Sequence, residues 1–119
     1  MATTELSLQQ HKPQVAEDVY DDGYLRVEHE NYYAACEGQM LKLPRTEFLI
    51  LSRLVRTPDR IVKSEELWAY AWGGDKPLNA ESLHVYIYRL RNKLAGRNLQ
   101  IDTMVNVGYR LLMQSSPAS

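Results

Sequence analysis

The stretch that decides the fold is LHVYIYRLRNKL, residues 83–94. Its apolar side chains recur three or four positions apart, and because a helix turns about 100° per residue, this spacing places them on one face. That inward face comprises Leu83, Ile87, Leu90 and Leu94. The outward face comprises Glu81, Val85, Tyr88, Arg89 and Asn92, with Ser82, His84, Arg91 and Lys93 along its edges. The pattern predicts a helix that packs one side on a core and exposes a polar, basic and aromatic side.

From Ser82 onward, this helix lacks the acids that would balance its cations. Four Lys and Arg residues and no Asp or Glu occur between Ser82 and Arg97. A solvated helix usually mixes both signs of charge through pairs four residues apart. Two interpretations therefore stay open, an anionic partner or a solvated face that happens to be basic.

Length and composition predict one small globular domain. The chain has 119 residues, of which 45% are hydrophobic and 24% charged, as is ordinary for a single domain. The formal net charge is -1, but residues 1–40 carry two cations and eight acids, whereas residues 41–119 carry twelve cations and seven acids. An anionic partner is therefore expected to meet the second half.

Cysteine content and hydropathy predict the compartment. The single Cys36 cannot form an internal disulfide, which favours a reducing compartment. The sequence has no secretory apolar segment and no apolar run of membrane-spanning length, so we expect a cytoplasmic protein without a membrane partner.

The N-terminal third of the sequence predicts an arm followed by strands. Residues 1–22 are polar, lack periodicity and end in an acidic cluster, which predicts a flexible arm. Alternating apolar positions in residues 24–43 predict a small antiparallel meander. The folded domain is expected to span residues 23–114, and residues 115–119 to form a disordered tail.

Two further helices and a hairpin complete the prediction. Residues 45–57 have helical periodicity and stop before Pro58, and a second helix is expected to begin with Ser64 as its N-cap and to stop at Gly73. Asn79 is expected to cap the helix of the opening stretch, and Gly96 to end it. Residues 99–105 and 109–113 predict two strands joined by a turn.

Strands, three helices and a hairpin in this order are the plan of an α+β winged helix-turn-helix domain. Three stretches carry a closer similarity: LPRTEFLILSRLVRTPDRIVKSEELWAYAWG (43–73), LHVYIYRLRNKL (83–94) and IDTMVNVGYRL (101–111). In this order and spacing, residues 24–113 resemble the DNA-binding effector domain of bacterial OmpR/PhoB-type response regulators. The resemblance implies a sequence-specific transcriptional regulator of the nucleoid, with the recognition helix 79–95 in the major groove of double-stranded DNA and the hairpin wing 99–113 at the minor groove.

The resemblance also implies roles for individual residues. Val85, Tyr88 and Arg89 are expected at base edges, where Arg can bond to guanine and Val can pack on a thymine methyl group. Ser82, His84 and Arg91 are expected near phosphates, whose neutralisation gives affinity independent of sequence. The further candidates for DNA contact are Asn92, Thr103, Asn106, Trp72 and Tyr109. For Thr103 the alternative is a plain strand former, and for Trp72 and Tyr109 it is packing in the core.

The sequence departs from the family pattern at the wing and on the recognition helix. Tyr88 stands where family members frequently carry Arg, and Val105 followed by Asn106 stands where the family often has an Arg for the minor groove. Minor-groove recognition is therefore expected to be weak, and specificity to come from two copies bound head to tail on direct-repeat half-sites. We expect the acidic N-terminal region of one copy to meet a basic surface of the next, formed by Arg53, Arg56 and Arg60.

Other implications concern partners and alternatives. The resemblance implies that Gly74, Asp75 and Lys76, in the loop before the recognition helix, contact RNA polymerase, and the alternative is a plain connector. A response regulator would carry a phosphorylatable receiver domain ahead of this region, and the sequence has only the short arm there, so phosphorylation is not expected to be a built-in switch. The alternative function is a protein-protein interaction module on a winged-helix scaffold with little DNA affinity.

Enzymatic function is not predicted. The sequence has no phosphate-binding glycine loop and no nucleophile elbow, and its three histidines, His11, His29 and His84, are too scattered for a metal-ligand motif. We therefore expect no catalytic residue, no metal and no cofactor.

Overall fold

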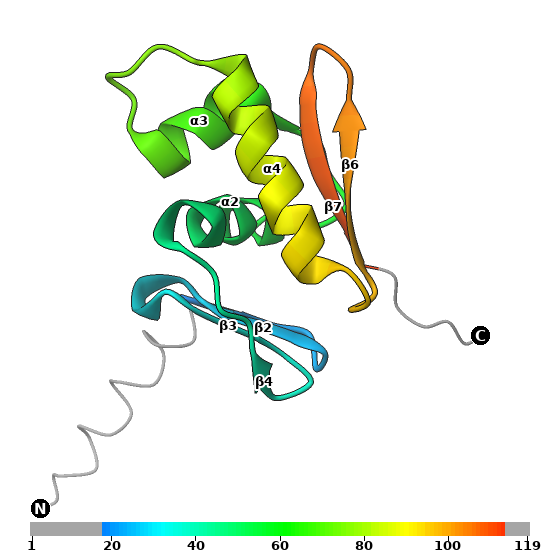
Figure 1. Cartoon of the computed structure of the whole chain (residues 1–119). Coiled ribbons are helices and arrows are strands. Elements are labelled where there is room, and N and C mark those ends of the chain that lie inside the picture. Colours follow the sequence, from blue (N-terminus) through cyan, green and yellow to red (C-terminus); the bar gives the residue numbers. More distant parts are fainter. Residues whose placement is uncertain (1–17, 114–119) are drawn as a thin grey trace, which may run out of the picture.

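The computed structural model describes residues 18–113. The elements in chain order are β1 (Val19–Asp21), β2 (Leu25–Glu28), the 3-10 turn η1 (His29–Asn31), β3 (Tyr33–Cys36), β4 (Gln39–Met40), α2 (Arg45–Val55), β5 (Val62–Lys63), α3 (Ser64–Trp72), α4 (Ala80–Leu94), β6 (Leu99–Met104) and β7 (Gly108–Met113). Figure 1 shows the N-terminal sheet at one end of the molecule, the three helices above it, and the β6–β7 hairpin running alongside α4. The predicted winged helix-turn-helix plan is confirmed.

The N-terminal sheet is the predicted meander with one strand more. Its strand order is β1-β2-β3-β4, all antiparallel. Leu25 and Val27 of β2 lie opposite Cys36 and Ala34 of β3, and all four are buried. Strand β1 pairs with β2 at residues 19–21, so the prediction that the arm extends to residue 22 was wrong. The rest of the predicted arm, residues 1–17, and the predicted tail, residues 115–119, lie outside the described residues.

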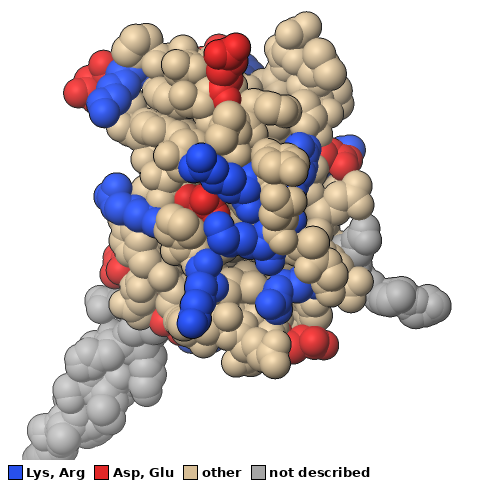
Figure 2. All heavy atoms as spheres, in the orientation of Figure 1, with Lys and Arg blue, Asp and Glu red and all other residues tan. Residues whose placement is uncertain are grey.

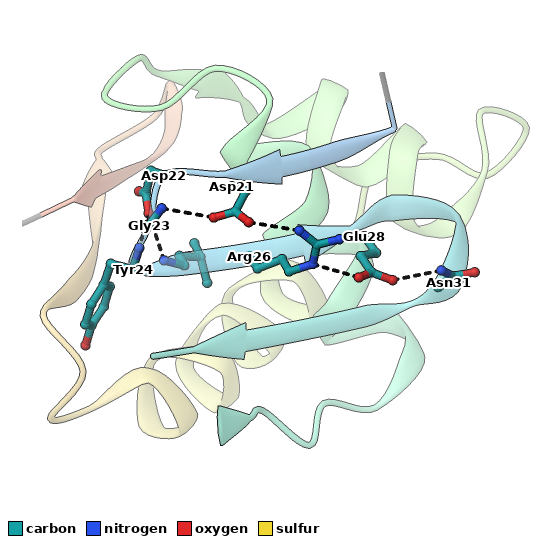
Figure 3. A network of polar contacts seen from close by, with 8 residues as sticks. Asp21, Asp22, Gly23, Tyr24, Arg26, Glu28 and Asn31 are labelled. Carbon is teal, nitrogen blue, oxygen red and sulfur yellow. Dashed lines mark hydrogen bonds and ion pairs between the residues drawn. The ribbon is translucent and has the colours of Figure 1, made fainter. Parts of the chain in front are cut away.

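Asp21 and Asp22, which were predicted to end a flexible arm, instead form the turn between β1 and β2 (Figure 3). The Asp22 carboxylate accepts hydrogen bonds from the backbone N–H groups of residues 24 and 25, both at 2.8 Å. Asp21 accepts from the backbone N–H of Gly23 at 2.9 Å, and this bond, with that from Arg26, holds the pKa of Asp21 below its ordinary value. Arg26 also pairs with Glu28 at 2.7 Å. The local negative charge is thus balanced by backbone donors and one guanidinium, and the segment folds.

A series of polar contacts, buried at His29 and Ser52 and exposed at Arg56, joins the N-terminal sheet to the helices. His29 Nδ1 lies 2.6 Å from Ser52 Oγ on α2, and Ser52 Oγ lies 2.9 Å from the hydroxyl of Tyr70 on α3. Arg56 Nε donates to that same hydroxyl at 3.2 Å. Burial lowers the pKa of His29, and the nearby Arg56 charge lowers it further. These surroundings therefore favour a neutral imidazole at His29.

The three helices bury the faces that periodicity assigned to the core. On α2 the predicted stripe of Phe48, Leu51, Leu54 and Val55 is buried, as is the stripe of Leu83, Ile87, Leu90 and Leu94 on α4. The side chain of Asn79 accepts from the backbone N–H of Ser82 at 3.0 Å, so the predicted cap of α4 is confirmed. The N-cap of α3 is Lys63, with no side-chain bond, and the prediction of Ser64 as that cap was wrong. No helix within residues 18–113 has the length and apolar character needed to cross a membrane.

The wing is a three-stranded sheet rather than a simple hairpin. Strands β6 and β7 pair from Leu99 opposite Met113 to Met104 opposite Gly108, as predicted. The two-residue strand β5 adds to β7, giving the order β5-β7-β6. Gly108 lies so close to β5 that a Cβ atom there would be 2.0 Å from the carbonyl oxygen of Val62. The extra strand therefore fixes the base of the wing against the helical core.

Candidate nucleic-acid interface

The outward face of α4 is exposed as the periodicity predicted. Val85 and Tyr88 have 42% and 58% of their surface exposed, and His84, Arg89 and Asn92 are exposed beside them. Ser82 is half-buried, and its backbone N–H donates to the cap residue Asn79. Figure 2 shows Lys and Arg side chains gathered across the middle of the face on which α4 lies in Figure 1, with most acids toward its edges. The helix thus presents apolar, aromatic and basic side chains together.

Arg91, expected near phosphates, connects α4 to the wing. Its Nε and one Nη donate to the carbonyl oxygen of Ile101 at 2.9 and 2.8 Å, and that Nη also donates to Thr103 Oγ1 at 2.7 Å. Strand β6 is an edge strand, so its outward carbonyl groups need a partner other than β7. The structure thus brings two predicted DNA contacts, Arg91 and Thr103, into contact with each other.

Lys93 has a partner that sequence reasoning missed. Its Nζ lies 2.8 Å from a carboxylate oxygen of Glu47 on α2, and Glu47 is only 2% exposed. Lys93 Nζ also donates a hydrogen bond to that oxygen, and a carboxylate needs such a partner when it is buried. Part of the positive charge of α4 therefore neutralises a buried carboxylate of α2. No signal in the sequence links these two residues, which are 46 positions apart.

Arg89 lies over an aromatic ring. The centre of its guanidinium is 4.9 Å from the ring centroid of Tyr86, one turn earlier on α4. The Tyr86 ring meets Trp72 edge to face at 5.2 Å and 87°, and Trp72 stacks on Trp68 at 4.1 Å and 13°. Trp72, a predicted candidate for DNA contact, thus packs between two other rings. Tyr86 was not among the residues that the sequence predicted to contact DNA.

Tyr109 is packed at the base of the wing. It is 6% exposed and stands opposite Thr103 in the ladder between β6 and β7. Burial raises the pKa of its hydroxyl. For Trp72 and Tyr109 alike, the structure provides the core packing that was the alternative to a DNA contact.

The tip of the wing is apolar. Met104, Val105 and Val107 are 44%, 73% and 45% exposed, and residues 103–107 include no charged side chain. Asn106 occupies the left-handed region at φ 64°, and the backbone N–H of Val107 donates to the carbonyl of Met104 at 2.9 Å. The tight turn directs the apolar side chains outward.

The loop between α3 and α4 is exposed but anchored. Gly74, Asp75 and Lys76 are all exposed, as a contact surface requires. The indole Nε1 of Trp68 donates to the carbonyl oxygen of Lys76 at 3.0 Å. The loop is therefore held to the aromatic cluster between α3 and α4.

Comparison with known proteins identifies the family. The family described as "transcriptional regulatory protein, C terminal" matches residues 38–111, more than half of the chain. The chain belongs to this family, the OmpR/PhoB-type DNA-binding domains. OmpR/PhoB-type domains are DNA-binding modules of transcriptional regulators and are not a class of enzyme.

Individual relatives agree with the OmpR/PhoB-type assignment. The response regulator ArlR of Staphylococcus haemolyticus is 29% identical over 98 residues, which cover 81% of this chain and 45% of ArlR. The chain spans about half the length of such curated relatives. The DNA-binding domain of CpxR from E. coli has a TM-score of 0.72 at 25% identity, covering 82% of this chain and 98% of that domain. The DNA-binding domain of Klebsiella pneumoniae RstA, solved in complex with the RstA box, has a TM-score of 0.65 at 23% identity, covering 79% of this chain and 96% of that one.

Proposed function

We propose that this chain is a sequence-specific regulator that binds double-stranded DNA, with α4 in the major groove and the β6–β7 wing at the minor groove. The observation that carries the proposal is the outward face of α4. Val85, Tyr88 and Arg89 are exposed together there, opposite a fully buried row, on a helix of the size that a major groove admits. RstA, which has the same fold, was solved bound to its DNA box, and this supports the same mode of binding here.

Base recognition is assigned to the central turn of α4. Arg89 can donate two hydrogen bonds to guanine O6 and N7, and Val85 can pack on a thymine methyl group. Tyr88 offers a hydroxyl that donates or accepts, and a ring that packs on a base or sugar. These three residues are expected to set the preferred sequence.

Phosphate contacts are assigned to the edges of α4 and to the wing. Ser82, His84 and Asn92 flank the base-reading residues and can donate to phosphate oxygens. Asn106 can donate from the tip of the wing, where Val105 contributes no charge. Arg91 and Thr103 are occupied by their mutual contact, and Trp72 and Tyr109 by packing, so we assign them to positioning the wing and α4.

Pairing of two copies on direct-repeat half-sites is the second part of the proposal. Among residues 18–40 six acids accompany a single cation, and this acidic sheet lies at the end of the molecule opposite the α3–α4 loop (Figure 1). The expected partner surface is only partly available, because Arg53 pairs with Glu66 at 3.4 Å and Arg56 bonds to Tyr70. The coupling between two copies is therefore expected to be small, and a two-site probe should fill with modest cooperativity.

Contact with RNA polymerase is proposed for Gly74, Asp75 and Lys76. All three are exposed on a loop that Trp68 holds in place, so the side chains can change without loss of the fold. Asp75→Ala and Lys76→Ala are expected to reduce transcription in a reconstituted system and to leave DNA affinity unchanged. A parallel loss of DNA affinity would show that the loop serves the structure instead.

A protein-protein interaction module is the second candidate function. The observation that favours it is the apolar character of the same surface, because Val85, Tyr88, Met104, Val105 and Val107 are five of the seven large hydrophobic side chains that the described residues expose. Exposed apolar patches often mark protein contacts. A mobility-shift selection against fragmented genomic DNA separates the two functions. Enrichment of one sequence motif supports the DNA-binding regulator, and uniform weak retention of all fragments supports the interaction module.

Arg89→Ala tests the base assignment on the selected fragment. Loss of a bidentate base contact is expected to lower affinity by about 1–3 kcal/mol and to relax the preference at one base pair. An equal loss on scrambled DNA would reassign Arg89 to the phosphate backbone.

A further inference from the structure

We propose that Tyr86 is a positioning residue for DNA recognition: its ring holds the Arg89 guanidinium in the orientation from which it reads a base. This inference rests on the proposed function, since it concerns the residue assigned there to guanine. Tyr86 is half-buried, lies three positions before Arg89 on α4, and has no place on the outward face itself. Its role is therefore exerted through Arg89.

No acid within residues 18–113 forms an ion pair with Arg89. The neighbours four positions away on α4 are Val85 and Lys93, and Lys93 is committed to Glu47. The Tyr86 ring, 4.9 Å from the guanidinium centre, is the partner that Arg89 has among residues 18–113. A cation at this distance over an aromatic face is attracted by the negative potential of the ring.

The Tyr86 ring is itself held rigidly by other aromatic rings. Trp72 meets Tyr86 edge to face at 87°, and Trp72 stacks on Trp68, which is 7% exposed and donates to the carbonyl of Lys76. The platform under Arg89 is thus continuous from the α3–α4 loop to the outward face of α4. An aromatic platform of this kind limits the conformations that a long side chain samples.

Holding the Arg89 guanidinium in place lowers the entropy cost of base recognition. An exposed Arg loses considerable side-chain entropy when it is fixed on a base, and a residue already ordered in the free protein loses less on binding. The smaller entropy loss favours binding where Arg89 makes a directed base contact, and it has no effect where DNA is held only through phosphates. Tyr86 is therefore expected to raise the affinity for the preferred sequence relative to other DNA.

The ring and not the hydroxyl should carry this role. No hydrogen bond to the Tyr86 hydroxyl is present in the part of the chain that the structure describes. Tyr86→Phe keeps the ring, whereas Tyr86→Leu keeps an apolar side chain on the same helix and removes the π face. The two variants form a matched pair.

The first measurement needs no DNA. A guanidinium over a ring experiences its ring current, so the Arg89 side-chain protons of the free chain are expected to be shifted upfield in the NMR spectrum of the unmodified protein and of Tyr86→Phe, and to return to ordinary values in Tyr86→Leu. Ordinary Arg89 shifts in the unmodified protein would overturn the proposal. The two tryptophans of the chain, Trp68 and Trp72, report in each variant whether the aromatic packing survives, through their emission spectra.

The second measurement compares DNA affinities at one salt concentration, on the selected fragment and on a scrambled one. Tyr86→Leu is expected to reduce the ratio of the two affinities about two- to fivefold, the factor that an exposed cation-π contact corresponds to, while Tyr86→Phe leaves it unchanged. In an Arg89→Ala background, Tyr86→Leu should change the ratio no further. An equal loss on both fragments, or the same reduction without Arg89, would assign Tyr86 to packing alone and overturn the proposal.

The two measurements separate this inference from the function on which it rests. If the unmodified chain shows the ring-current shift but prefers no DNA sequence, the proposed function fails and the base-reading role of Tyr86 fails with it. If the chain selects a sequence and the shift is absent, only the positioning role is refuted. Should Tyr86→Leu alter the tryptophan emission, Tyr86→Met, with a longer apolar side chain, replaces it in both measurements.

Discussion

Arg91→Ala separates a structural role of this arginine from the phosphate contact that its position on the recognition helix suggested. In the structure its guanidinium makes three hydrogen bonds to β6, two of them to the carbonyl oxygen of Ile101 and one to Thr103. The carbonyl lies on the outer edge of the wing, where no further strand can pair with it. Removal of Arg91 therefore leaves this acceptor to water and loosens the wing against α4.

The expected loss of stability in Arg91→Ala follows from the number and exposure of these hydrogen bonds. A hydrogen bond that involves a charged group contributes about 1.5–3 kcal/mol, and the values combine to less than their sum because two bonds share one acceptor and Arg91 is half-buried. We expect the free energy of unfolding to fall by about 2 kcal/mol, which lowers the melting temperature of a domain of this size by about 10 °C. Arg91→Lys keeps the charge with fewer bonds and should lose roughly half as much.

The assay combines urea unfolding with a salt titration of DNA binding. Arg89→Ala is the matched control for stability, because it is the same substitution two positions away on α4, and Arg89 has only its ring contact to lose. Its free energy of unfolding should change by less than about 1 kcal/mol. The salt slope of Arg91→Ala should stay that of the unmodified chain. Unchanged stability together with a slope lower by about 0.9 would refute this reasoning and assign Arg91 to a phosphate.

Three further predictions concern the wing and His29. Gly108→Ala should destabilise the domain by more than about 3 kcal/mol or prevent folding, since its Cβ would overlap the carbonyl oxygen of Val62 at 2.0 Å; wild-type thermal unfolding would contradict the β5–β7 contact. Val105→Arg should tighten binding to a single half-site, most on A·T-rich flanks where the minor groove is narrow and its potential most negative; titrations with A·T-rich and G·C-rich flanks measure this, and equal gains on both would argue against minor-groove contact. The pKa of His29 is lowered in the folded chain by burial and by the charge of Arg56. As the pH falls, the imidazole is therefore protonated in the unfolded chain before it is protonated in the folded chain. The contribution of His29 to stability is complete above about pH 6.5 and is lost as the pH falls through the lower pKa of the folded chain. Urea unfolding between about pH 5 and 7.5 should show this loss in the unmodified chain and less of it in His29→Asn, and identical pH profiles would mean that His29 is not the group responsible.

Local patterns in the sequence were sufficient for the three helices, for the strands other than β1 and β5, and for the exposed surface of α4. The stripe from Leu83 to Leu94 depends on a spacing of three and four residues, which any helix converts into a face, and so Val85, Tyr88 and Arg89 had to lie opposite it. The cap at Asn79 and the wing hairpin likewise follow from residues close together in the chain. The departure at Val105 was visible in the sequence for a different reason, because the resemblance to the family places an Arg at that position.

Tertiary structure decided which side chains remain available on that surface. Strand β5 has only two residues, too few to show an alternating pattern, and it exists because β7 is beside it. Lys93 is paired with Glu47 across 46 positions, Arg91 with the wing, and Arg89 lies over Tyr86, whose ring is packed by Trp72. Periodicity tells which way a side chain points, but a hydrogen bond or ring contact also needs a partner at a suitable distance, and the partner's position is set by how distant segments pack.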